Sequence, residues 1–236
     1  MNTNPVLYLL PGLLCDADVW AHQQSSLAPF ADIRIPNFRG FDSFRGMALH
    51  VLEQAPERFS VVGHSMGGRV ALELMHLAPE RIDRFAIMDV GVHPLQAGET
   101  ERRQRTIDIA EQQGMEALAD AWIPPMVHPA RHRDAALMGA IKRMVLRSSA
   151  ADYCGQIQAA LTRADHSLYL PHIRQEVLVI CGAEDAWSPV EQHEEIVAQL
   201  PHARLVLIPD AGHMVTMEQP EAVSRVLVDW FTAAAE

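Results

Sequence analysis

Residues 59–69 read FSVVGHSMGGR, and they place one serine between a strand-like run and a helix-like run. Three of the first four residues are apolar, and this run is suited to a buried β-strand. From Arg69 to Leu77 the apolar residues recur at helical spacing, so a helix is expected there. Ser65 lies between the two runs, with a glycine two residues before it and another two residues after it. Small neighbours of this kind let the chain turn sharply and hold the hydroxyl out above a sheet, so the pattern predicts a nucleophile.

The alternation of strand-like and helix-like runs extends along most of the chain. Stretches with helical spacing, such as 191–200, separate short apolar runs rich in β-branched residues. Strands that alternate with helices form a parallel sheet that is covered on both faces. We therefore predict an α/β fold with a doubly wound, mostly parallel sheet. Its strands are expected at 6–10, 33–35, 59–62, 85–88, 177–180 and 205–208.

The alternation is interrupted between residues 92 and 170. No convincing strand pattern occurs there, and prolines and glycines break the sequence into several helix-like pieces. We interpret 92–170 as a helical insertion into a core formed by 1–91 and 171–236. The insertion contains nine acidic and nine basic residues, so the other 21 acidic and 10 basic residues carry the whole net charge of −11.

Composition narrows the classes of partner. A chain of 236 residues that is 49% hydrophobic can bury one sizeable core. Its formal charge of −11 disfavours binding to nucleic acid and to anionic membrane surfaces. The apolar run 6–14 is too short to cross a bilayer, and no basic segment precedes it as in a secretory signal. We expect a cytoplasmic protein with a small-molecule substrate and neither a membrane nor a nucleic-acid partner.

A base and an acid for the serine follow two later strands. The run 177–180 leads into CGAED at 181–185, and the run 205–208 leads into PDAGH at 209–213. The carboxyl ends of parallel strands share one edge of a sheet, so Asp185 and His213 are expected close to Ser65. The chain order Ser, Asp, His is the order of an α/β-hydrolase triad. Glu184 and Asp89 are the rival acids, and we favour Asp185.

Three motifs together resemble the α/β-hydrolase superfamily. They are GHSMGG at 63–68, GAEDAWSP at 182–189 and AGH at 211–213, and the resemblance covers nearly everything outside the insertion. It implies a cofactor-free, small bacterial esterase-like enzyme with a Ser65, Asp185, His213 triad, and it places the insertion where the family carries a helical cap. We expect the antiparallel strands that often open this fold to be missing, since the first predicted strand begins at Val6.

The loop after the first strand departs from the family pattern. Many members have His-Gly there, whereas this chain has PGLL at 11–14. Pro11 has no N–H to donate. We therefore assign the two oxyanion-binding N–H groups to Leu13 and Met66.

The sequence does not indicate a metal site. Cys15, Cys154 and Cys181 are scattered and are expected to be free thiols. His128 and His132 are four residues apart, but Pro129 between them argues against a helical pair of ligands.

The residues beside the triad in the sequence are uncharged, which predicts an apolar pocket. We expect hydrolysis of a carboxylic ester whose small to medium substrate is mainly apolar. A thioester, a lactone or a carbon-carbon bond could be cleaved by the same triad, and a non-catalytic ligand receptor is a further alternative. Arginines of the insertion that turned inward would instead recruit a carboxylate, with Arg102, Arg131 and Arg143 as candidates. The predicted pocket residues are Leu14, Val92, Trp122, Trp187 and Met214.

Overall fold

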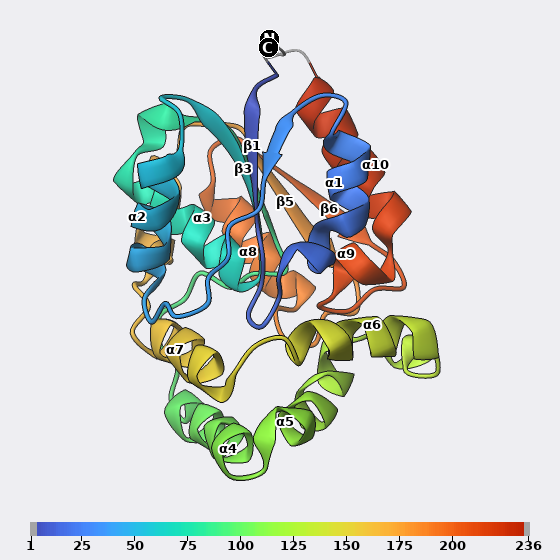
Figure 1. Cartoon of the computed structure of the whole chain (residues 1–236). Helices are drawn as coiled ribbons and strands as arrows, with labels where there is room; N and C mark the ends of the chain where they lie inside the picture. The colour runs from blue at the N-terminus through green and yellow to red at the C-terminus, as the bar shows by residue number, and fades with distance from the viewer. Residues whose placement is uncertain (1–3, 234–236) are drawn as a thin grey trace.

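A six-stranded parallel sheet forms the centre of the computed structural model, which describes residues 4–233 (Figure 1). The strand order is β2-β1-β3-β4-β5-β6, and every neighbouring pair is parallel. The chain moves outward from β1 to β2 and then in the opposite direction from β3, which makes the sheet doubly wound as predicted. The strands are β1 (Val6–Leu10), β2 (Asp32–Arg34), β3 (Phe59–His64), β4 (Ile82–Met88), β5 (Val177–Gly182) and β6 (Ala203–Ile208).

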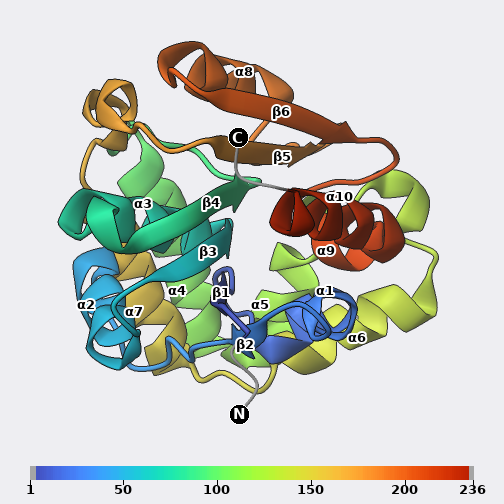
Figure 2. The same ribbon diagram turned by 90° about the horizontal axis from the view of Figure 1, so that it is seen from above.

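Helices cover both faces of the sheet (Figure 2). One face carries α2 (Phe44–Gln54), α3 (Met66–Leu77) and α8 (Val190–Gln199); the other carries α1 (Ala21–Leu27) and α10 (Pro220–Thr232), which follows the short α9 (Val215–Glu218). Alternate residues of β1 divide between the two sides. Leu7 and Leu9 join one apolar cluster and Tyr8 and Leu10 join the other, as the two-residue period of a strand requires.

Four further helices lie beyond the carboxyl ends of the strands (Figure 1). They are α4 (Glu99–Gln112), α5 (Gly114–Trp122), α6 (Ala135–Val145) and α7 (Ala150–Leu161), and no strand occurs among them. We call this layer the cap. Its buried side chains Trp122, Ile141 and Tyr153 belong to the same apolar cluster as α1 and α10, so the cap and the sheet region share a core.

Short 3₁₀ turns complete the described secondary structure, at Ala17–Trp20, Pro79–Arg81, Pro124–Met126, Pro129–Arg131, His166–Leu168 and Leu170–His172. Across residues 4–233, no helix combines the length and the apolar character that crossing a membrane demands.

The turn between β3 and α3 is both strained and tightly packed. Ser65 has φ 52° and ψ −115°, a backbone conformation that residues other than glycine rarely adopt. A Cβ added to Gly63 would lie 2.3 Å from the carbonyl oxygen of Gly67, and one added to Gly67 would lie 2.1 Å from the carbonyl oxygen of Leu10. Only glycine fits at these two positions, because the obstructing atoms belong to the backbone.

We expect Gly67→Ala to lower the free energy of unfolding by about 2–3 kcal/mol, because the end of β1 at Leu10 must move away from the new methyl group. Gly139→Ala is the matched control, since its methyl group would meet only the flexible end of Arg143, at 3.2 Å, inside helix α6. The control is expected to raise stability by about 0.5–1 kcal/mol through helix propensity. Urea unfolding followed by circular dichroism measures both, and a Gly67→Ala midpoint equal to that of the wild type would contradict the packing argument.

Candidate active site

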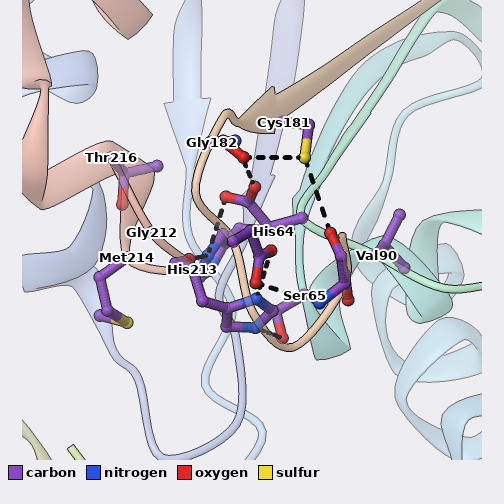
Figure 3. Close-up of polar contacts among 12 residues, drawn as sticks. His64, Ser65, Val90, Cys181, Gly182, Gly212, His213, Met214 and Thr216 are labelled. Atoms are coloured by element: carbon purple, nitrogen blue, oxygen red, sulfur yellow. Dashed lines mark hydrogen bonds and ion pairs between the residues drawn. The ribbon is translucent and has the colours of Figure 1, made fainter. Parts of the chain in front are cut away.

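Ser65, His213 and Asp185 form one hydrogen-bonded chain at the carboxyl edge of the sheet. Ser65 follows β3 and His213 lies in the loop after β6, and the two side chains lie next to each other (Figure 3). Asp185 follows β5. The Oγ of Ser65 is 2.7 Å from Nε2 of His213, and Nδ1 of His213 is 2.8 Å from Oδ2 of Asp185. The structure thus brings the three residues named from the sequence into the geometry that activates a serine.

The environment of Asp185 keeps its carboxylate ionised and fixed. Its second oxygen, Oδ1, accepts hydrogen bonds from the backbone N–H groups of Trp187 (2.8 Å) and Ser188 (3.0 Å). Burial alone would raise the pKa of Asp185, but the charge and hydrogen bond of His213 and these two N–H groups outweigh it and lower the pKa. A carboxylate at Nδ1 makes that nitrogen the donor, which leaves Nε2 free to accept the proton of Ser65.

His64 lies buried behind the serine and holds the backbone of His213. Its Nε2 donates to the carbonyl oxygen of His213 over 2.7 Å, and only 1% of its surface is exposed. Burial, followed by the proximity of His213, lowers the pKa of His64 to about 4, so the ring is neutral near pH 7. His64 therefore positions the base.

Glu218, which the sequence did not single out, clamps the loop that carries His213. Its Oε1 accepts from the N–H groups of Gly212 (3.0 Å) and Met214 (3.1 Å), and its Oε2 accepts from the N–H of His128 in the cap (2.8 Å). Glu218 is 1% exposed, so these bonds compensate for burying a carboxylate. No local pattern indicated this role, because it depends on α9 folding back under the loop.

The two rival acids do not contact His213. Asp89 is fully buried, accepts from the N–H of Gly182 through Oδ1 (2.9 Å), and has Oδ2 3.7 Å from Nε2 of His64. Burial, and then the nearby charge of Asp185, raise the pKa of Asp89 well above its usual range, which favours a protonated carboxyl. Glu184 accepts from the N–H of Ala211 instead (3.1 Å).

The backbone N–H groups of Leu13 and Met66 lie beside Ser65 and have no hydrogen-bond partner among residues 4–233. The neighbouring N–H of Leu14 is engaged, since it donates to Oε1 of Gln156 on cap helix α7 (2.8 Å). Met66 also begins helix α3, so the positive end of the helix dipole points toward the serine. The arrangement can stabilise a negative oxygen that develops next to Ser65.

A cavity of about 660 Å³ opens between the sheet edge and the cap. Its walls include Leu13, Ser65, Met66, Trp122, Trp187, His213 and Met214. Two residues predicted for the pocket do not line it. Leu14 is 1% exposed and packs into the core cluster that contains Trp20, while Val92 packs into the cluster on the other side of the sheet. The sequence placed both near the triad but could not show which way their side chains turn.

The expectation that the pocket is uncharged is wrong. Four arginines, Arg69, Arg102, Arg103 and Arg163, line the cavity together with Glu99. We call these four residues the arginine cluster. Arg102 was one of the three candidates from the insertion, whereas Arg131 and Arg143 are not among the lining residues. The cluster joins α3 to the cap, which the sequence pattern did not reveal.

Glu99 pairs with two members of the arginine cluster. Its Oε1 is 2.8 Å from Nη2 of Arg103, and its Oε2 is 2.6 Å from Nη2 of Arg163. Burial alone would raise the pKa of Glu99, but hydrogen bonds from Arg163 and Arg103 outweigh it and lower the pKa to about 2.

Among residues 4–233, possible metal ligands come together at one place, near the carboxyl ends of β4 and β5. Within residues 4–233, one group of possible ligand atoms lies close together, from Asp89, Cys181 and His193. Nε2 of His193 already accepts from the N–H of Val90 (3.0 Å), and its Nδ1 contacts the carbonyl oxygen of Pro189 (3.1 Å). Burial also raises the pKa of the Cys181 thiol. These contacts explain the group as packing in the core.

Comparison with known proteins places the chain in a family. The model of the alpha/beta hydrolase family matches residues 7–226, almost the whole chain. The chain belongs to this family. A pimeloyl-(acyl-carrier protein) methyl ester esterase of Nitrosomonas europaea is 27% identical over 237 residues, and the match covers 93% of each protein. Hydrolase chemistry is therefore established at the level of the family.

Solved structures of hydrolases have the same fold as this chain. A thermophilic esterase of Thermogutta terrifontis superposes with a TM-score of 0.87 at 27% identity, over 96% of this chain and 89% of that one. An enol-lactonase of Burkholderia xenovorans gives a TM-score of 0.88 at 24% identity, over 98% and 92% of the two chains. Because the enol-lactonase is only 24% identical to this chain, its similarity shows that the two proteins share a fold and nothing further.

The low pKa of Glu99 predicts a pH-dependent contribution to stability. An acid whose folded-state pKa is depressed stabilises the fold above its unfolded pKa and loses that effect as the pH falls. We expect Glu99→Gln to lower the free energy of unfolding at pH 7 by on the order of 1–2 kcal/mol. The difference from the wild type should shrink as the pH falls from about 4.5 towards about 2.

Urea unfolding at several pH values measures this difference. Glu101→Gln, an exposed position on the same helix, is the control and should follow the wild type throughout. A Glu99→Gln difference that stayed constant down to pH 2.5 would show that the ion pairs do not account for it.

Proposed function

We propose that the protein is a serine hydrolase that cleaves a carboxylic ester through a covalent acyl-enzyme. The observation that carries the proposal is the continuous chain of hydrogen bonds from Ser65 through His213 to Asp185, which opens onto a cavity beside two unpartnered N–H groups. Family membership and the relatives named as esterases support the same chemistry.

In the first half of the reaction, His213 takes the proton of Ser65 while Oγ attacks the ester carbonyl carbon. The N–H groups of Leu13 and Met66 bind the oxygen that becomes negative, and Asp185 stabilises the charged imidazole. The carbon-oxygen bond to the alcohol then breaks, and His213 gives the alcohol its proton.

In the second half, His213 takes a proton from water, and the resulting hydroxide attacks the acyl-enzyme at the same carbonyl carbon. The bond to Oγ breaks and Ser65 regains its proton from His213. One water is consumed, and one carboxylic acid and one alcohol are released. Ester cleavage is favoured over thioester, lactone or carbon-carbon cleavage because two 27% identical relatives that each match more than nine-tenths of this chain are esterases by name. The complete hydrogen-bonded triad favours catalysis over a purely ligand-binding role.

The assignment of the acid predicts a ranking of two variants. Asp185→Asn is expected to lower kcat for a p-nitrophenyl ester by about 10³–10⁴, because an amide at Nδ1 no longer fixes the productive tautomer. Asp89→Asn is expected to lower it by less than about tenfold, because a protonated carboxyl and an amide are both neutral groups of similar shape. Ser65→Ala supplies the background rate, with a loss of about 10⁴ or more.

Initial rates at pH 7.5, with circular dichroism to verify folding, measure the ranking. The reverse order would move the acid to Asp89, and a Ser65→Ala enzyme with substantial activity would remove the proposed nucleophile.

A further inference from the structure

The arginine cluster lies in the same cavity as the nucleophile. Arg69 is in the first turn of α3, four residues after Ser65, and Arg102 and Arg103 project from α4 of the cap. Arg163 follows the end of α7. A substrate whose ester group reaches Ser65 therefore occupies a chamber that the four guanidinium groups also face.

The charge of this chamber is opposite to that of the whole chain. Four guanidinium groups line it, and Glu99 is the ionised carboxylate among the lining residues. Asp89 also contributes to the lining, but its raised pKa favours the neutral carboxyl. A chain with a net charge of −11 thus concentrates positive charge at its proposed active site.

Arg69 is the least compensated member of the cluster. It is 8% exposed, and the one hydrogen bond that its side chain makes within residues 4–233 runs from Nη1 to the carbonyl oxygen of His93 (2.9 Å). No carboxylate of the described chain lies within ion-pair distance of it. A guanidinium has five N–H donors, so most donors of this buried cation are unused by the protein.

A second cation lies close to Arg69. Nε of Arg163 donates to the same carbonyl oxygen of His93 (3.1 Å), so two guanidinium groups converge on one acceptor. Burial, and then the charge of Arg163, lower the pKa of Arg69 to about 9, which leaves it charged at neutral pH. An anion between the two groups would use the free donors and relieve the repulsion.

We infer that the arginine cluster binds a carboxylate carried by the substrate itself, so that the enzyme prefers half-esters of dicarboxylic acids, or esters with a carboxylate at the far end, over neutral esters. This inference rests on the proposed function, because it names the substrate class of the same site. Glu99 already pairs with Arg103 and Arg163. Arg69 and Arg102 have no carboxylate partner in the described chain, so their N–H donors are the ones available to a substrate carboxylate. Arginine suits this role because its planar guanidinium can donate two parallel hydrogen bonds to one carboxylate, whereas the ammonium of a lysine acts as a single point charge.

A matched pair of substrates tests the inference. Mono-p-nitrophenyl glutarate and p-nitrophenyl valerate have the same leaving group and acyl chains of five carbons, and they differ in whether the chain ends in a carboxylate or a methyl group. We expect kcat/KM for the glutarate half-ester to exceed that for the valerate ester by about tenfold or more. Raising the ionic strength from 0.02 M to 0.5 M should reduce this ratio several-fold, because screening weakens attraction between charges.

Arginine variants test which side chains cause the preference for the carboxylate-bearing ester. Arg69→Gln is expected to lower the glutarate-to-valerate ratio by about 10- to 100-fold, and Arg102→Gln by about 3- to 10-fold because that side chain is exposed. Arg58→Gln is the matched control: Arg58 is an exposed arginine that pairs with Asp83 and lies outside the cavity. The ratio should be unchanged in this control.

The outcomes separate the inference from the proposed function. If the wild type cleaves both esters through Ser65 but prefers valerate, and Arg69→Gln leaves the ratio unchanged, the carboxylate subsite is wrong and the hydrolase assignment stands. If the folded wild type cleaves neither ester, the proposed function fails, and calorimetric titration with glutarate then tests the subsite alone. Binding to the wild type that is lost in Arg69→Gln would support the subsite, and no binding to either would overturn it.

Discussion

The hydrogen bond between Oγ of Ser65 and Nε2 of His213 is the contact on which the proposed chemistry depends. It spans 2.7 Å and joins residues 148 positions apart in the chain. The two residues follow strands that are not neighbours, because β4 and β5 lie between β3 and β6 in the sheet. The contact forms only if every intervening strand is parallel and in register, so that the loop after β6 can reach back over the edge. Glu218 and His64 hold this loop on both sides.

Backbone strain is concentrated at the same edge. The non-glycine residues with positive φ in the described chain are Leu14, Ser65, Asp89 and Asp210, and each follows a strand at its carboxyl end. Such conformations persist when the surroundings compensate for them. At Ser65 the compensation includes the hydrogen bond from its N–H to the carbonyl oxygen of Met88 (2.9 Å) and the close packing that Gly67 permits. The sheet region thus fixes the position of Ser65, while the cap supplies much of the cavity wall.

The sheet and the triad could be predicted from the sequence because each depends on a short pattern. Six apolar runs coincide with the six strands, and Ser65, Asp185 and His213 each follow such a run. Parallel strands bring their carboxyl ends to one edge whatever the details of packing, so adjacency followed from topology alone. Asp185 was also favoured over Asp89 from the sequence, and the hydrogen bond from His213 to Asp185 agrees with that choice.

The character of the pocket could not be predicted in this way, because it depends on how the cap packs against the sheet. Leu14 and Val92 are neighbours of the site in sequence, yet their side chains are used in the core. Arg69 was placed within the helical pattern after the serine, and nothing local showed that its guanidinium faces the same cavity as Arg163, 94 residues later. Gln156 likewise acts through a contact with a distant segment, and Glu218 accepts from the N–H of His128, 90 residues away in the cap.

The central claim is that His213 activates Ser65, and labelling with a fluorophosphonate tests it most directly. Such reagents react with a serine hydroxyl that is paired with a base and lies beside an oxyanion-binding site. Mass spectrometry of the digested protein identifies the labelled residue and its extent. The account predicts one labelled serine, Ser65, and loss of labelling in a folded His213→Ala variant. Labelling at another serine, or undiminished labelling of Ser65 without His213, would contradict it.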